Sequence, residues 1–137
     1  ILVGEHMRNL ETSVDMLVNG ASFFSRADPD YDGGITGCHK LIAASEGLGM
    51  DCEIHACGPP MRQLMAASRN SNFYEVNLLH PKCVNPWSLP VYNDSYSDQI
   101  DCIDKNGNVK VSDQPGLGIE YDWKYIEKNK IQSLIIK

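Results

Sequence analysis

The first 78 residues alternate strand-like segments with helical patterns, and this alternation restricts the possible folds more than any other feature of the sequence. Strand-like segments occupy 1–4, 21–27, 50–55 and 73–78. Each stretch between them is long enough for one crossover helix, so the element order is βαβαβαβ. This order predicts an α/β fold with parallel strands covered by helices, either an open sheet or part of a TIM-like (β/α) barrel.

Apolar residues recur at helical spacing in the three stretches between these segments. The first helix is expected to start near Leu10 and to end at Gly20. The second is expected from about Thr36 to about Leu48. The third opens at Pro59, which is compatible with a helix because proline is tolerated in a first turn.

The sequence changes character after His80, where a proline-rich stretch begins. Further on, QIDCID and NVKVSD flank Lys105-Asn106-Gly107, a pattern typical of a β-hairpin. We therefore expect two parts, with 1–80 supplying the strands and 81–137 packing on them. Within the second part, the expected pieces are a turn with a short closing segment (114–126) and a strand or helix end (131–137).

Composition and charge narrow the classes of function. The net charge of −6 disfavours nucleic acid and anionic membranes as partners, because both need a basic surface. No apolar run reaches the ~20 residues of a membrane span, and the start lacks the features of a secretory signal. Five cysteines without a CxxC pair favour reduced thiols in a cytoplasmic protein. The chain has no initiating Met, and we expect it to be a fragment.

The segment DPDYDGGITGCH has the beginning of an EF-hand calcium loop. Asp28, Asp30 and Asp32 would occupy loop positions 1, 3 and 5, with Gly33 at position 6. However, the preceding ASFFSRA is strand-like where an EF-hand has a helix. His39 also stands at position 12, where a bidentate Glu is needed. Calcium binding is therefore the less favoured interpretation.

Each strand-like segment delivers one ionisable residue at or near its carboxyl end: Glu5, Asp28, His55 and Glu75. Each alone could be a surface charge or a structural histidine. Together they indicate a site, because parallel barrels build active sites at this end from several strands. Adjacent strands lie about 4.8 Å apart, so Asp28 could hydrogen-bond His55 and raise its basicity. Glu5 suits Mg²⁺, and such a set suggests proton abstraction next to a carboxylate.

Three further residues are candidates for substrate contact. His6 follows Glu5 directly. An equal alternative for His6 is to hold the metal ligand Glu5 in place without contacting the substrate. Cys57 and Arg62 follow His55 near the expected mouth of the barrel.

Five motifs are spread over almost the whole chain: VGEH (3–6), DPDYDGGITGCHK (28–40), His55 after EGLGMDCEI, NFYE (72–75) and PGLGIEYDW (115–123). They occur in the order found in one protein family. Because of these motifs, the chain resembles the C-terminal half of an enolase-superfamily protein of the mandelate racemase/muconate lactonizing enzyme type. The resemblance implies a (β/α)₇β barrel with a capping domain, in which the strands here are the fifth to eighth.

The resemblance also implies a role for each ionisable residue. Glu5 matches the third metal-binding carboxylate of a Mg²⁺ site, and His55 matches the general acid/base with Asp28 as its partner. Glu75 matches the glutamate that hydrogen-bonds the substrate carboxylate in the intermediate. The family's other two metal carboxylates and its lysine motif lie upstream of Ile1. This chain alone is therefore expected to bind Mg²⁺ weakly and to show no turnover.

The Asp–His pair and the GEH motif fit acid-sugar dehydratases, which are hydro-lyases, better than racemases or epimerases of 2-hydroxy acids. We therefore expect a small carboxylate substrate, an aldonate or aldarate, that loses water through an enediolate. The full-length protein is expected to be a homo-oligomer. A non-catalytic barrel half is the alternative from another class, since exposed strand edges favour association.

Overall fold

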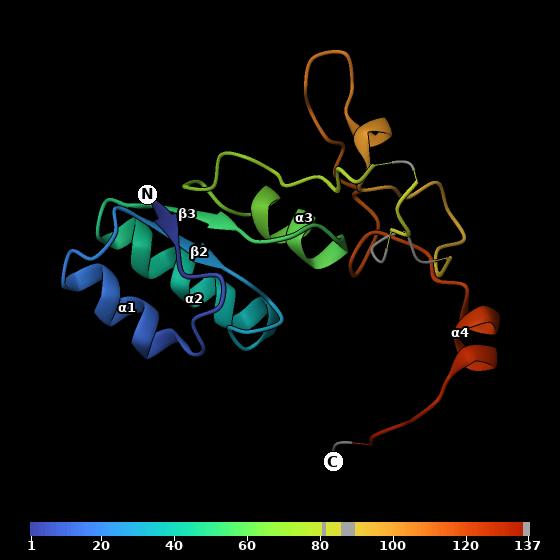
Figure 1. The fold of residues 1–137 in the computed structure, drawn as a ribbon, viewed down its shortest axis with the longest axis horizontal. Coiled ribbons are helices and arrows are strands. Elements are labelled where there is room, and N and C mark those ends of the chain that lie inside the picture. The colour runs from blue at the N-terminus through green and yellow to red at the C-terminus, as the bar shows by residue number, and fades with distance from the viewer. Residues whose placement is uncertain (81, 86–89, 136–137) are drawn as a thin grey trace.

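A computed structural model describes residues 1–80, 82–85 and 90–135. Helices and strands alternate from the N-terminus to α3, as the sequence predicts (Figure 1). The strands are β1 (Leu2–Val3), β2 (Phe24–Ala27) and β3 (Asp51–Ile54). The helices are α1 (Leu10–Val18), α2 (Gly34–Gly47), α3 (Pro59–Ala66) and, after a 3-10 turn at Ile100–Cys102, α4 (Trp123–Asn129).

The strands form one parallel sheet in the order β1-β2-β3, which confirms the predicted α/β architecture. Val3 pairs with Ser25, and Ser25 pairs with Cys52 on the far side. Helices α1 and α2 lie side by side on one face of the sheet (Figure 1). Ser25 and Ala27 of β2 are buried beneath them, so the alternation of side chains along a strand places Arg26 on the opposite face.

The hydrophobic core lies between the sheet and the helices. It contains nine buried residues, all between Leu17 and Leu64. Leu17 of α1, Leu41 of α2 and Leu64 of α3 are each 1% exposed. Burying one leucine side chain contributes roughly 1.5–3 kcal/mol, so these contacts fix the helices on the sheet. Cys38 and Cys52 lie in the same core as free thiols.

Local sequence signals explain where the helices begin. The Asn9 side chain accepts a hydrogen bond from Thr12 N at 3.0 Å and thereby caps α1. Pro59 and Pro60 occupy the first turn of α3, as expected, because the amides of a first turn have no partner within the helix. Helix α2 begins at Gly34, two residues before the predicted start at Thr36.

The segment at 73–78 does not form the predicted fourth strand, since no strand is present between 71 and 80. The Glu53 carboxylate accepts hydrogen bonds from the backbone amides of Asn72 and Phe73 at 3.0 and 3.1 Å. Farther along, Asn77 N donates to Asp98 O at 2.6 Å. Because a side chain and the C-terminal segment use these amides, they do not pair in a ladder with β3.

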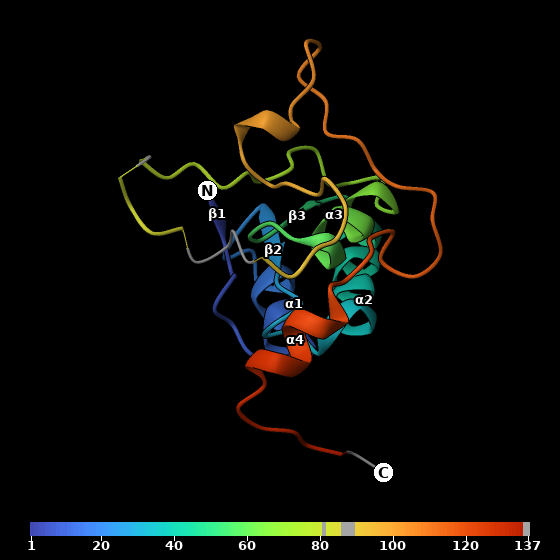
Figure 2. The same cartoon turned by 90° about the vertical axis from the view of Figure 1, so that its right-hand side faces the viewer.

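The C-terminal segment, residues 90–135, extends away from the strands on the side of α3 (Figures 1 and 2). An antiparallel bridge between Ile103 and Val109 closes the predicted hairpin, although no regular strand forms around it. The Asp104 carboxylate holds the turn by accepting hydrogen bonds from the amides of Asn106 and Asn108 at 2.8 and 2.9 Å.

Helix α4 was not predicted, because its residues were interpreted as a closing segment. Asp122 caps it by accepting a hydrogen bond from Tyr125 N at 2.9 Å, and an aspartate before WKYI is the signal that could have revealed it. Residues 131–135 form neither helix nor strand. Pro81, Pro86 and Trp87 of the proline-rich stretch lie outside the described residues. Within the described ranges, no helix has the length and apolar character needed to cross a membrane.

Candidate active site

Asp28 and His55 follow the carboxyl ends of β2 and β3, and the sheet register brings them together. His55 N donates a hydrogen bond to Ala27 O at 2.8 Å, which continues the pairing beyond the last strand residue. His55 Nδ1 and Asp28 Oδ2 then lie 2.5 Å apart. The Asp28 side chain is 3% exposed and that of His55 is 25% exposed. The contact predicted from the strand spacing is confirmed, with the imidazole on the solvent side of a buried carboxylate.

The turn after β2 holds the Asp28 carboxylate from its other side. Asp30 N donates to Asp28 Oδ1 at 2.8 Å, so each carboxylate oxygen has one partner. The backbone amide of Asp28 donates to Asp32 Oδ2 at 2.8 Å. A carboxylate fixed in this way accepts the proton on Nδ1 of a neutral imidazole, and the lone pair is then on Nε2.

The acidic run after β2 is a tight turn and not an EF-hand loop. A strand precedes it, and α2 begins inside the sequence that the loop would occupy. Asp32 is buried, and burial raises the pKa of its carboxyl. Gly33 and Gly34 have φ values of 77° and 71°, which glycine adopts most readily. No three metal-binding side chains gather anywhere in the described part of the chain, so the calcium interpretation lacks a site.

Glu5 and His6 follow β1, next to the end of β2. The His6 ring centre lies 5.9 Å from that of His55 and 5.5 Å from that of Tyr31. A hydrogen bond from its own backbone amide lowers the pKa of the Glu5 carboxyl; partial burial opposes this, and the charges of Arg26, His55 and His6 add to the lowering. The carboxylate is therefore ionised at neutral pH and lies close to the Asp28–His55 pair.

Glu75 reaches the same site from the irregular segment after α3. Its Oε2 atom accepts a hydrogen bond from Ala56 N at 2.7 Å and contacts Nη2 of Arg26. Ala56 has a φ of 64°, which is uncommon for a residue with a Cβ. A cavity of about 270 Å³ opens here, lined by His55, Ala56, Cys57 and residues 75–78. The predicted acid/base and the predicted carboxylate-binding residue therefore share one cavity.

Cys57 lines this cavity as a neutral thiol. It is 7% exposed, and burial raises the pKa of the thiol to about 12. At neutral pH it is therefore an uncharged part of the cavity wall. Because only the thiolate is a strong nucleophile, the Cys57 thiol is also unreactive there.

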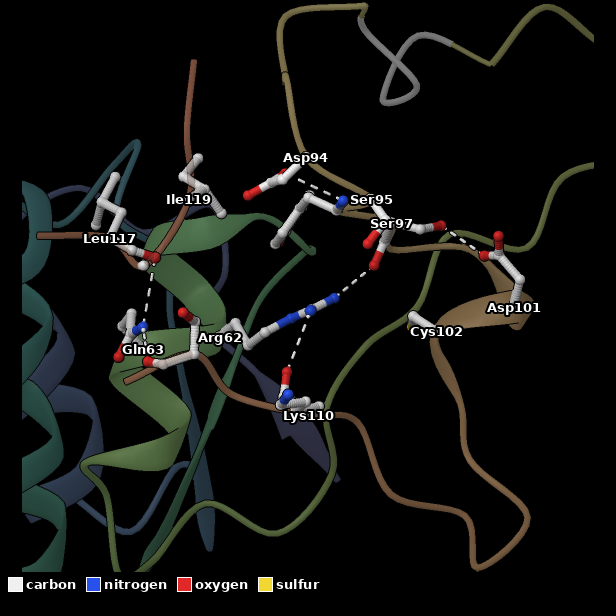
Figure 3. Close-up of a pocket in the computed structure, with 13 residues that line it drawn as sticks. Arg62, Gln63, Asp94, Ser95, Ser97, Asp101, Cys102, Lys110, Leu117 and Ile119 are labelled. Atoms are coloured by element: carbon white, nitrogen blue, oxygen red, sulfur yellow. Dashed lines mark hydrogen bonds between the residues drawn. The ribbon is translucent and has the colours of Figure 1, made fainter. Parts of the chain in front are cut away.

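Arg62 lies on α3, with its guanidinium directed toward the C-terminal segment (Figure 3). Nη2 donates to Ser97 O and Asp98 Oδ1, both at 2.6 Å, and Nη1 donates to Lys110 O at 3.3 Å. The guanidinium carbon also lies 4.4 Å from the centre of the Tyr96 ring. Arg62 lines a separate cavity of about 310 Å³ and does not line the one beside His55. Its contacts anchor the C-terminal segment, and substrate contact by Arg62 stays a prediction.

The sequence profile of a family described as enolase C-terminal domain-like matches residues 1–125. The chain belongs to this family. Its fold is that of the C-terminal half of an enolase-superfamily barrel of the mandelate racemase/muconate lactonizing enzyme type. The family assignment that the sequence motifs suggested is therefore confirmed.

Solved structures that resemble the chain include the following two. D-glucarate dehydratase from Agrobacterium tumefaciens, complexed with magnesium, is 30% identical with a TM-score of 0.81. The alignment covers 96% of this chain but only 33% of that enzyme, so the chain spans about a third of its length. An enolase from alpha pretobacterium bal199 with bound Mg is 20% identical with a TM-score of 0.70, and the alignment covers 93% of this chain and 31% of that one. No curated protein sequence matches.

Magnesium fits this enolase-superfamily chain only in part. Glu5 offers an ionised carboxylate oxygen, which is the kind of ligand that Mg²⁺ prefers. Across residues 1–80, 82–85 and 90–135, no second and third ligand gather with it. Glu5 could therefore hold one position of a magnesium site, and the described residues do not form a complete one.

Arg26 is the residue of the site that sequence reasoning missed. It lies between the buried Ser25 and Ala27 and contacts Glu75, a residue 49 positions away in the sequence. The signal that could have revealed it is a cation inside a short strand, on the face opposite the core.

Proposed function

We propose that this chain supplies the proton-transfer part of an active site that dehydrates a sugar acid, an aldonate or aldarate, with Mg²⁺ as cofactor. The observation that carries the proposal is the 2.5 Å contact between the buried Asp28 carboxylate and His55 Nδ1 at neighbouring strand ends. The likeness to D-glucarate dehydratase supports this substrate class and a hydro-lyase reaction.

His55 is the acid/base of the proposed reaction. With the proton on Nδ1 held by Asp28, Nε2 takes the proton from the carbon next to the substrate carboxylate and leaves an enediolate. Asp28 stabilises the imidazolium that forms. The same imidazolium returns its proton to the hydroxyl on the next carbon, which leaves as water. The remaining enol becomes a 2-keto acid, so one histidine serves both proton transfers where the substrate stereochemistry allows it.

Glu5 would hold one position on the magnesium ion. When bound, the ion supplies positive charge that makes the proton next to a carboxylate more acidic. Glu5, His6 and His55 lie together, so proton removal takes place beside this charge. Neither Asp28 nor His55 has to bind the ion, and the imidazole stays free to move protons.

The substrate would bind in the cavity beside His55. Its volume of about 270 Å³ is near the lower end of ordinary small-molecule sites. Glu75 lies at the carboxylate end of the substrate, and Cys57 forms an uncharged wall. His6 approaches the imidazole edge-on and is a further candidate for substrate contact.

For the complete enzyme we propose a cytoplasmic homo-oligomer with no nucleic-acid or membrane partner. Free cysteines support a reducing compartment, and the net charge of −6 disfavours polyanionic partners. In this chain, Ile1, Phe23 and Leu78 are 94%, 74% and 70% exposed. These apolar side chains support association of the barrel half with further protein.

The test supplies the missing strands in one polypeptide. This chain replaces the matching third of D-glucarate dehydratase, and the folded chimera is incubated in D₂O with Mg²⁺ and a panel of sugar acids. NMR should show a 2-keto product and solvent deuterium on the carbon that lost the hydroxyl, and His55→Asn should abolish both. Asp30→Asn should change neither, because Asp30 uses only its backbone amide at the site. A folded chimera that binds Mg²⁺ but exchanges no proton contradicts the proposal.

The isolated chain of 137 residues is a useful second case. It should bind Mg²⁺ weakly and show no turnover, because it offers one ligand of the site. Dehydration of a sugar acid by this chain alone would contradict the proposal that the active site needs metal ligands from outside this chain.

A further inference from the structure

Arg26 has surroundings that set it apart from the other charged residues of the sheet. Its register partner on β3 is Glu53, the carboxylate that would ordinarily neutralise it. However, four donors from residues 71–73 occupy the Glu53 carboxylate, two backbone amides and two side chains. The Arg26 guanidinium instead extends toward the strand ends and contacts Glu75. The fold thus brings a cation from the sheet face into contact with Glu75, a residue that lines the cavity beside His55.

Glu75 acts as an acceptor in this arrangement. A single oxygen, Oε2, receives both the Arg26 Nη2 donor and the backbone amide of Ala56. The resemblance to the family implies that the glutamate here donates a hydrogen bond to the substrate. In this chain, the Glu75 carboxylate lines the cavity, and the donor group that it holds is the Arg26 guanidinium.

The Arg26 guanidinium has at least one N–H donor that makes no hydrogen bond within the described part of the chain. Arginine carries about five N–H donors in a rigid fork that matches a carboxylate. The Arg26 Nε atom is buried and has no hydrogen-bond partner among the described residues. The side chain is 20% exposed, so it is mostly removed from water but still accessible. Glu5, the proposed metal ligand, is close enough to feel its charge.

We propose that Arg26 binds the carboxylate of the substrate, with Glu75 as the residue that positions its guanidinium. This inference rests on the proposed function, since it names the group that recognises the acid in that same site. Arg26 would bind the substrate carboxylate, and Glu5 would supply one ligand to the magnesium ion. The positive charge of the guanidinium would add to that of the ion and stabilise the enediolate that forms when His55 takes the proton.

The test measures binding and needs no turnover. The chain, labelled with ¹⁵N, is titrated with D-gluconate, and the Arg26 Nε–H signal is followed by NMR. D-glucitol, which has a CH₂OH group in place of the carboxylate, is the control ligand. Gluconate should shift the Arg26 signal and glucitol should not. If gluconate does not shift the Arg26 Nε–H signal of the wild-type chain, the proposal is overturned.

Variants separate Arg26 from Glu75. Arg26→Met should weaken gluconate binding about tenfold, and Arg26→Lys should weaken it less, because lysine keeps the charge but loses the fork. Arg69→Met is the matched control, since Arg69 is 89% exposed on the surface, and binding should not change. Glu75→Gln should also weaken binding, because the guanidinium loses its anchor. Unchanged affinity in Glu75→Gln or in Arg26→Met contradicts the proposal.

Failure of this inference is distinguishable from failure of the proposed function. A chimera without proton exchange overturns the reaction and leaves the gluconate measurement standing. If gluconate binds equally well to the wild-type chain and to Arg26→Met, the role of Arg26 is overturned, and the proposed role of the Asp28–His55 pair is unaffected. Circular dichroism of each variant shows whether it is folded. If Arg26→Met does not fold, the titration of the wild-type chain still decides whether Arg26 binds gluconate.

Discussion

The part of the chain from β1 to α3 and the segment from residue 90 to 135 fold by different means. The first buries nine residues in one hydrophobic core between helices and a parallel sheet. The second buries no apolar side chain among its described residues and is attached by polar contacts, chiefly those of Arg62 with Ser97 and Asp98. The difference teaches that the core and the turn after β2 position Asp28 and His55, whose hydrogen bonds with each other and with the turn all lie within the first part.

Thiol reactivity should show the largest contrast, between the β1–α3 part and Cys83, an exposed residue that lies before the second part. Burial raises the pKa of Cys38 and of Cys57 to about 12, so at pH 8 both are neutral thiols. Cys83 is exposed. Iodoacetamide at pH 8 should therefore modify Cys83 faster than Cys57 by about a thousandfold, since only the thiolate reacts. Mass spectrometry of the peptides gives the rates, and comparable rates for Cys57 and Cys83 would mean that the site wall is open.

A core substitution should have the next largest effect. Leu41→Ala removes a side chain that is 1% exposed and leaves a cavity, which should lower the free energy of unfolding by about 3 kcal/mol. Leu48→Ala, at the end of the same helix and 43% exposed, should lower it by less than about 1 kcal/mol. Urea unfolding followed by circular dichroism measures both. Equal losses for the two variants would remove the distinction between the core and the surface of α2.

Breaking the anchor of the C-terminal segment should cost somewhat less. The Arg62 and Asp98 side chains are 12% and 10% exposed, so Arg62→Met leaves a nearly buried carboxylate without its cation and should cost about 2 kcal/mol. Hydrogen exchange should become faster in 90–122 but not in β2 or β3. Arg69→Met is the control, because its 3.9 Å surface pair with Glu46 contributes about 0.5 kcal/mol or less. Faster exchange in β3 would mean that the site depends on the C-terminal segment.

Acidification should produce the smallest effect on the C-terminal segment, a local change at the hairpin turn. Backbone hydrogen bonds from Asn108 and Asn106 lower the pKa of the exposed Asp104 carboxyl. A carboxyl with a lowered pKa stabilises the turn above its ordinary pKa, and this contribution is lost as pH falls through the lowered value. The amide signals of Asn106 and Asn108 should therefore move together at acid pH in an NMR titration. Asp104→Asn should abolish this transition and leave the β1–α3 core unchanged.

The features that could be predicted from the sequence are local in origin. Helical spacing and strand composition are properties of neighbouring residues, and the parallel order follows from their alternation. The contact of Asp28 with His55 follows in turn, because strand spacing fixes the distance between neighbouring strand ends.

The features that the sequence did not reveal depend on contacts between distant residues. Glu53 captures the amides at 72–73 and prevents a fourth strand, although 73–78 has a strand-like composition. Arg26 joins the site only because Glu75 returns to it after α3. Arg62 follows His55 by seven residues, yet it contacts the C-terminal segment instead of the cavity. Spacing along the chain contains no information about these partners.

The imidazole of His55 offers the most direct measurement of the central claim, that Asp28 holds His55 as a base with its lone pair on Nε2. The ¹⁵N shifts of the two ring nitrogens, recorded at a pH where the imidazole is neutral, report which one carries the proton. The account predicts a proton on Nδ1 in the wild-type chain and a mixture of both forms in Asp28→Ala. A wild-type imidazole protonated on Nε2, or one that is unchanged in Asp28→Ala, would contradict it.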